Sequence, residues 1–154
     1  MNTIQDFAAH TSVAIQRAGE GKRLNVLGDN QTIKISGKET GGQFTIIENY
    51  NDPGIGIPMH VHDNEDEVFL ILEGEMEFET QGETTILKPG DMIFLPRRVP
   101  HAFRVVGTQK AKASVTIMPA GIEEMFEVLS QLPAGQPDLE QVADICRSFG
   151  ISFV

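Results

Sequence analysis

Residues 54–74 read GIGIPMHVHDNEDEVFLILEG, and this stretch decides the predicted fold of the chain. His60 and His62 stand two positions apart, so on an extended backbone both imidazoles project from the same side. Glu67 follows after a four-residue polar turn, where the next strand-like run begins. A second strand can therefore bring a carboxylate back towards the histidine pair. Side chains of these types are typical ligands of a divalent transition metal.

A second segment, residues 90–103, reads GDMIFLPRRVPHAF and adds a further imidazole. His101 follows Pro100 and begins another strand-like run, with Phe103 on the same face. Three imidazoles with one carboxylate suit Fe, Mn, Ni, Co, Cu or Zn, whereas Ca²⁺ and Mg²⁺ prefer oxygen ligands alone. The sequence therefore predicts one divalent transition metal as the cofactor.

The acidic turn between these strands leaves a choice of carboxylate. Asp66 could serve as the carboxylate at a spacing shorter by one residue. We favour Glu67, because it shares a strand face with Phe69 and Ile71 and follows His62 after a gap of four residues. We interpret Glu65 and Asp66 as solvated turn residues. His10 lies in an unpatterned N-terminal stretch and is assigned no role.

Both segments resemble the two sequence motifs of the cupin family. The second departs from its motif at Arg98, where the family pattern has glycine, and at Val105, where it has asparagine. These two positions shape the backbone rather than bind metal, so the ligand set is unaffected. The first motif is matched at Gly54, His60, His62, Glu67 and Gly74, and the second at Gly90, Pro96 and His101.

The resemblance covers residues 44–118 and implies an all-β fold, the cupin double-stranded β-helix (jelly-roll) barrel, with a short C-terminal helical tail. The whole layout is similar to small bacterial single-domain cupins often likened to quercetin dioxygenase. The resemblance also implies a metal inside the mouth of the barrel, with His60, His62, Glu67 and His101 as its ligands.

Such a centre favours a metal-dependent, dioxygenase-like oxidoreductase acting on a small aromatic or enol-type organic substrate, with Glu67 as a catalytic base. Two alternatives stay open: a non-catalytic small-molecule-binding cupin, and a metal-dependent sugar isomerase, which basic residues in the pocket would favour. Arg97 is a candidate partner for an anionic group of the substrate. The candidate apolar residues of the cavity wall are Met59, Phe69, Ile71, Met76, Phe78, Phe94 and Phe103.

Around the motifs, short runs separated by turn residues predict roughly eight to ten strands between residues 24 and 118, with a polar loop at 37–42. In residues 75–80 three glutamates alternate with Met76 and Phe78, as in a half-buried strand. We interpret these glutamates as a solvated face without function. The strand-like runs are 24–27, 32–36, 44–48, 68–72, 75–80, 84–87, 92–95, 102–106 and 114–118.

The last part of the chain changes to a helical period. Apolar stripes lie in 122–129 and 139–149, and the second is preceded by Asp138 as a cap and followed by Gly150 as a stop. The predicted division of the chain is an N-terminal arm (1–23, with a short helix near 4–9), a barrel (24–118) and a helical extension (119–154).

Composition narrows the class of partner. With 12 basic and 22 acidic residues the net charge is −10, which argues against nucleic acid and anionic membranes as partners. Cys146 is the only cysteine, which excludes an intramolecular disulfide. The chain shows neither a secretory signal pattern nor an apolar run long enough for a membrane span. We expect a cytoplasmic protein with a small-molecule substrate, and the family resemblance implies a homodimer.

Overall fold

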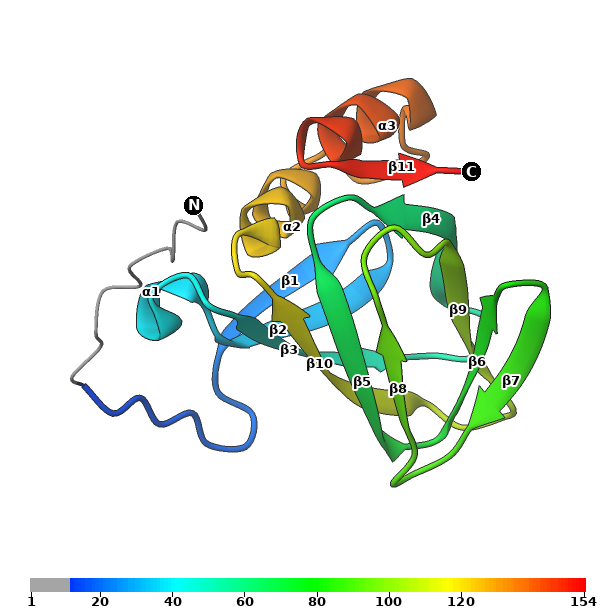
Figure 1. The fold of residues 1–154 in the computed structure, drawn as a ribbon, viewed down its shortest axis with the longest axis horizontal. Coiled ribbons are helices and arrows are strands. Elements are labelled where there is room, and N and C mark those ends of the chain that lie inside the picture. The colour runs from blue at the N-terminus through cyan, green and yellow to red at the C-terminus, as the bar shows by residue number, and fades with distance from the viewer. Residues whose placement is uncertain (1–11) are drawn as a thin grey trace, which may run out of the picture.

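Two antiparallel β-sheets form the body of the molecule and curve around a shared interior (Figure 1). The computed structural model describes residues 12–154. The first sheet has six strands in the order β1 (Lys22–Val26), β2 (Asp29–Ile35), β3 (Thr45–Asn51), β10 (Ala111–Met118), β5 (Asp66–Glu73) and β8 (Met92–Leu95). The second has five strands in the order β11 (Ile151–Phe153), β4 (Gly56–His62), β9 (His101–Val106), β6 (Glu75–Thr80) and β7 (Glu83–Leu87).

The predicted all-β jelly-roll fold is confirmed. Ten strands, β1 to β10, lie between Lys22 and Met118, and every predicted strand-like run overlaps one of them. The predicted helix near residues 4–9 lies outside the described residues.

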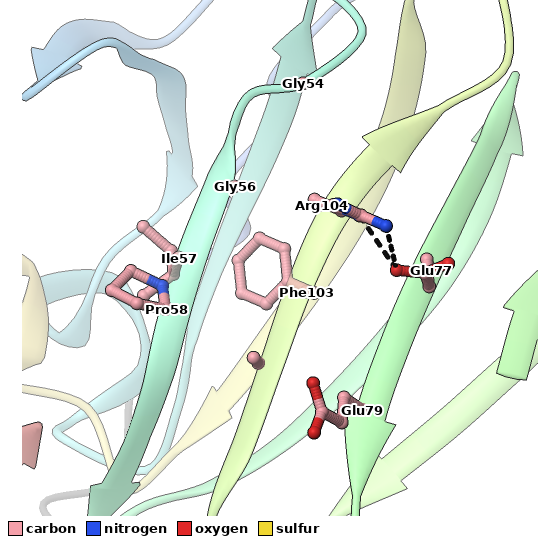
Figure 2. Close-up of a pocket in the computed structure, with 9 residues that line it drawn as sticks. Gly54, Gly56, Ile57, Pro58, Glu77, Glu79, Phe103 and Arg104 are labelled. Carbon is pink, nitrogen blue, oxygen red and sulfur yellow. Dashed lines mark hydrogen bonds and ion pairs between the residues drawn. The ribbon is translucent and has the colours of Figure 1, made fainter. Parts of the chain in front are cut away.

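Strand β6 illustrates how alternation in the sequence becomes a barrel wall. Met76 and Phe78 are 2% and 1% exposed in the interior, and burying each contributes roughly 2 kcal/mol. Glu77 takes the opposite, outer face, where Arg104 of the neighbouring β9 donates a 2.8 Å hydrogen bond to its carboxylate (Figure 2). The glutamates of β6 thus lie on the outer face, as the alternating pattern predicts, and two of them, Glu75 and Glu77, also form ion pairs there.

Helices α2 (Ile122–Ser130) and α3 (Leu139–Ser148) confirm the predicted helical tail. Asp138 caps α3, because its carboxylate accepts hydrogen bonds from the backbone N–H groups of Glu140 (3.0 Å) and Gln141 (3.2 Å). After α3, Gly150 has φ +80°, a left-handed conformation that lets the chain turn back towards the barrel. No helix within residues 12–154 is long and apolar enough to cross a membrane.

The tail is not purely helical, because its last residues form strand β11 beside β4. Ile151 pairs with His62, and Phe153 pairs with His60. A segment this short shows no period in the sequence, so the strand was not predicted. Its pairing covers the edge of the five-stranded sheet beside two of the predicted metal ligands.

A short helix, α1 (Gly37–Thr40), replaces the polar loop that was predicted between β2 and β3. Ser36 and Glu39 form a reciprocal capping box at its start. The carboxylate of Glu123 in α2 accepts hydrogen bonds from the backbone N–H of Gly37 (2.8 Å) and of Gly121 (2.7 Å). Glu123 therefore ties the start of α1 to the start of α2.

Candidate metal centre

Four side chains from three strands converge between the two sheets. His60 and His62 come from β4 and His101 from β9 of the five-stranded sheet, while Glu67 comes from β5 of the six-stranded sheet. Each offers one ligand atom, these atoms lie within 4.8 Å of one another, and all four residues are buried. The structure therefore brings together the four residues that the sequence pointed to, and they form a cluster that could hold a metal ion.

Strand geometry explains why these side chains meet. His60 and His62 are 5% and 4% exposed, whereas Val61 between them points the other way and is half-buried. His60 lies directly opposite His101 on the neighbouring strand. The pairing of β4 with β9 shifts register between Ile57 and His60, and such an irregularity re-aims a strand just before the first ligand.

Backbone carbonyl groups orient two of the three imidazoles. The Nδ1 of His60 lies 2.8 Å from the carbonyl oxygen of Pro58, and the Nδ1 of His101 lies 3.1 Å from that of Val99. Because a carbonyl oxygen only accepts, each Nδ1 carries the proton and donates it. With Nδ1 held in this way, Nε2 is the ring atom that remains for a metal ion, as ligation through a histidine requires.

Glu65 orients the third imidazole, and its interpretation as a solvated turn residue is wrong. Glu65 is 8% exposed, and its carboxylate accepts from the Nδ1 of His62 at 3.3 Å. Asp66 is not a freely solvated residue either, because Arg97 donates to it from its backbone N–H (2.8 Å) and from its guanidinium group (2.9 and 3.1 Å). Because the polar turn is short, Glu65 lies close to His62, three positions before it in the chain. This spacing is the feature of the sequence from which the contact could have been predicted.

The cluster sets the protonation of its own members. Burial, and then the charge of His101, lower the pKa of His60 to about 4, so this imidazole is neutral near pH 7. Burial also acts to lower the pKa of His62, but the hydrogen bond to Glu65 and the charge of Glu67 outweigh it and raise that pKa. Burial acts to raise the pKa of Glu67, yet the surrounding imidazoles outweigh it and lower that pKa. An ionised carboxylate thus faces a neutral His60 and a His62 whose proton a bound metal would have to displace.

Two atoms of the cluster have no hydrogen-bond partner within the described part of the chain. They are the Oε2 of Glu67 and the Nε2 of His101, both buried and 3.0 Å apart. The two atoms form an ion pair when the Nε2 of His101 also carries a proton, and a bound cation would satisfy both of them in place of that proton. Native proteins rarely leave buried polar atoms unsatisfied. The donor set and these two atoms fit a divalent transition metal.

A cavity of about 550 Å³ opens beside the cluster and is mostly apolar. His60, His62 and Glu67 form part of its wall, together with three of the residues predicted there, Met59, Phe69 and Phe103. The other predicted wall residues lie elsewhere. Ile71, Met76 and Phe78 belong to the core, Phe94 is 58% exposed, and Arg97 is exposed in its pair with Asp66.

The C-terminal elements supply one part of the cavity wall that sequence reasoning missed. Met125 and Leu129 of α2, Val142 and Cys146 of α3, and Phe153 of β11 all line the cavity. Burial raises the pKa of the Cys146 thiol, which keeps it protonated and unreactive near pH 7. Helical periodicity identified these apolar stripes, but only tertiary packing shows that they cover a cavity.

A smaller groove of about 310 Å³ lies across β4, β6 and β9 (Figure 2). Glu77, Glu79 and Arg104 contribute its polar groups, and the ion pair of Glu77 with Arg104 satisfies two of them. The groove contains none of the clustered imidazoles. The larger cavity is therefore the candidate substrate site.

Comparisons with known proteins agree with this description. The family model described as "Cupin domain" matches residues 51–118. The chain is 30% identical to quercetin 2,3-dioxygenase from Bacillus subtilis (strain 168) over 113 residues, which cover 73% of this chain and 33% of that protein. The solved structure of KdgF from Halomonas sp. has a TM-score of 0.64 at 18% identity, covering 73% of this chain and 99% of that one. The polyketide cyclase RemF from Streptomyces resistomycificus has a TM-score of 0.60 at 25% identity, covering 71% of this chain and 81% of that one.

These likenesses differ in what they show. The chain spans about a third of the length of the quercetin 2,3-dioxygenases it matches, namely 33% of the Bacillus protein and 29% of that from Aspergillus japonicus. The likeness to KdgF shows the fold alone, because so few residues are identical.

Proposed function

We propose that this chain, a small cupin whose cupin domain spans residues 51–118, is a metal-dependent oxidoreductase of the dioxygenase type. The substrate class is a small aromatic or enol-type organic molecule. One observation carries the proposal: a buried cluster of three imidazoles and one carboxylate opens directly onto a mostly apolar cavity of about 550 Å³. The similarity to quercetin 2,3-dioxygenases supports the same activity.

The proposed roles follow from the position of each side chain. His60, His62, Glu67 and His101 would hold the metal, which supplies Lewis acidity and redox capacity where the cavity meets the cluster. Glu67 is the proposed base, because it is a buried carboxylate that lines the cavity and can accept the proton of a substrate hydroxyl. Phe69 and Phe103 would keep water from the reacting group and pack against a flat ring.

The absence of basic side chains from the wall of the large cavity, among the described residues, helps to choose between substrate classes. Among residues 12–154, no lysine or arginine lines the large cavity. A sugar phosphate needs cationic partners for its phosphate group. The wall therefore gives no support to the sugar isomerase alternative, and it favours a molecule with an apolar ring system.

The test begins with metal content. Purified protein is compared with a His60→Ala/His62→Ala variant and with Glu79→Gln, a control on the exposed face of β6. We expect near-stoichiometric transition metal in the native protein and the control, and none in the histidine variant. Dioxygen uptake is then measured with flavonols, catechols and diketones. Native protein that stays metal-free after reconstitution near pH 8, where imidazoles are deprotonated, would refute the proposal.

The likeness to the polyketide cyclase RemF supports a second candidate, cyclisation of a polyketide in the large cavity, a reaction that would leave the dioxygen level unchanged. The same apolar cavity would accommodate such a molecule. The dioxygen electrode separates the two, since turnover of a polyketide-like phenol at constant dioxygen would favour the second candidate.

A further inference from the structure

The large cavity has a second polar group in its wall, apart from the metal cluster. Asp29, Gln31 and Asn49 line the cavity, and Asn51 donates a hydrogen bond to the carboxylate of Asp29. They are 3%, 5%, 4% and 4% exposed, which is rare for such polar residues. We call these four residues the amide cluster. None of them belongs to the two motifs that define the candidate metal centre.

The carboxylate of Asp29 organises this cluster. It accepts hydrogen bonds from the side-chain amide of Gln31 (2.7 Å), of Asn49 (2.9 and 3.0 Å) and of Asn51 (2.6 Å). The oxygens of Asp29 accept in all of these hydrogen bonds, so each amide turns its NH₂ group towards Asp29. This fixes the orientation of all three amides, and their carbonyl oxygens point away from the carboxylate.

Two of those three oxygens are left without a partner. The Oδ1 of Asn51 accepts from the backbone N–H of Asn30 at 2.8 Å. The Oε1 of Gln31 and the Oδ1 of Asn49 are buried, and no group in the described part of the chain donates to them. Leaving two buried acceptors unpaired is costly, and a donor from outside the chain, either a water molecule or a group of a ligand, would remove that cost.

The two free oxygens belong to neighbouring residues of one sheet. Gln31 of β2 and Asn49 of β3 are direct partners across the strand pair, so their side chains stand together on the inner face. Across the same sheet Glu67 pairs with Ile117, which pairs in turn with Thr45 of β3. Asn49 lies four residues beyond Thr45, which is roughly 13 Å along the strand direction. A ligand that reaches both polar groups is therefore elongated.

We propose that Gln31 and Asn49 are a substrate-recognition pair, accepting hydrogen bonds from a hydroxyl-bearing end of an elongated aromatic substrate whose other end meets the metal cluster. This inference rests on the proposed function and narrows its substrate class from aromatic molecules to polyhydroxylated ones. The mostly apolar wall between the two polar ends takes the ring system. A molecule without the distal hydroxyl leaves the buried acceptors unpaired and binds more weakly.

The experiment compares two flavonols that share the chelating 3-hydroxyl and 4-keto groups. Quercetin carries further ring hydroxyls, whereas 3-hydroxyflavone carries none. Binding is measured without dioxygen, by calorimetry or fluorescence, on metal-loaded and metal-free protein. We expect native protein to prefer quercetin by roughly fivefold or more. In Gln31→Met, which keeps the length of the side chain and removes its oxygen, we expect this preference to fall to near one.

The control variant is Phe126→Leu, which trims apolar surface in the same cavity and should weaken both probes by a similar factor. Asn49→Leu is the second variant, used if thermal unfolding shows that Gln31→Met does not fold. Equal affinity of native protein for the two flavonols, or an unchanged preference in the variants, would overturn the inference and assign these oxygens to trapped water. A preference that persists in metal-free protein supports the recognition pair even where dioxygen uptake fails.

Discussion

The Nε2 of His101 lies 3.0 Å from the Oε2 of Glu67, and neither atom has a hydrogen-bond partner among the described residues. Without a metal, this contact is satisfied only when the His101 ring carries a second proton on Nε2. A bound cation would satisfy both atoms without that proton.

Metal loading should raise thermal stability for this reason. A ligand at about one hundred times its dissociation constant stabilises the folded state by about 2.7 kcal/mol, which shifts the melting temperature of a chain of this size by roughly 5–10 °C. The measurement is thermal unfolding of chelator-treated protein with and without added Mn²⁺, Ni²⁺ or Zn²⁺. In His101→Ala the same additions should produce no comparable shift, and an equal shift in that variant would contradict the assignment of His101 as a ligand.

Glu65 should tune metal affinity without binding the metal. Its carboxylate holds the Nδ1 of His62, and loss of such a partner costs roughly 10–100-fold in metal affinity. We expect Glu65→Ala to retain the fold and weaken metal binding by that factor, measured by competition with a chromophoric chelator. The matched control is Asp66→Asn, which alters the adjacent carboxylate and its pair with Arg97. Equal losses in both variants would indicate a general effect of the turn rather than orientation of His62.

Local signals in the sequence pointed to three of the four clustered residues, because His60 and His62 share one strand face and Glu67 lies near the start of the next strand. His101 lies far along the chain, and the family resemblance joined it to the other three. The strands followed from alternation and turn residues, which are local signals as well. Glu65 was misjudged because a polar residue in a short turn looks solvated until its neighbours in space are known.

The cavity wall was predicted less well, and β8 shows why. Its four residues are all apolar, so the sequence holds no alternation that tells inner from outer positions. In the structure Phe94 pairs with Val68, while Leu95 pairs with Glu67. Directly paired residues share a face of the sheet, which places Leu95 inside with the carboxylate and Phe94 outside. The covering by α2, α3 and β11 depends on contacts between distant segments, which no local pattern encodes.

Glu123 should make stability depend on pH. Burial acts to raise its pKa, but the backbone N–H groups of Gly37 and Gly121 outweigh burial, so the folded-state pKa is lowered from 4.5. A lowered carboxyl pKa adds stability above the unfolded-state value and loses it as pH falls through the folded-state value. We expect the free energy of unfolding of Glu123→Gln at pH 7 to be about 1–2 kcal/mol lower than that of the native protein.

The difference between native protein and Glu123→Gln should shrink as the pH falls below the ordinary carboxyl value of 4.5 and through the lowered pKa of Glu123 in the folded state. Urea unfolding across this range is the measurement. Glu124→Gln changes the exposed neighbour on the same helix and serves as the control. A Glu123→Gln penalty that is constant from pH 7 to pH 3 would show that shape, rather than charge, determines the role of this side chain.

Two glycines of the motifs should differ in how much an added methyl group costs. Gly74 has φ +69°, and a Cβ built there would overlap the carbonyl oxygen of Lys110 and the Cα of Ala111. Gly90 has φ +95° but has open space where its Cβ would be. Both substitutions by alanine carry the cost of a left-handed backbone, about 1–2 kcal/mol, and only Gly74→Ala adds a clash with backbone atoms. We expect Gly74→Ala to destabilise the fold clearly more than Gly90→Ala in chemical unfolding. Equal penalties would mean that the connection between β5 and β6, which crosses from one sheet to the other, shifts to admit the methyl group.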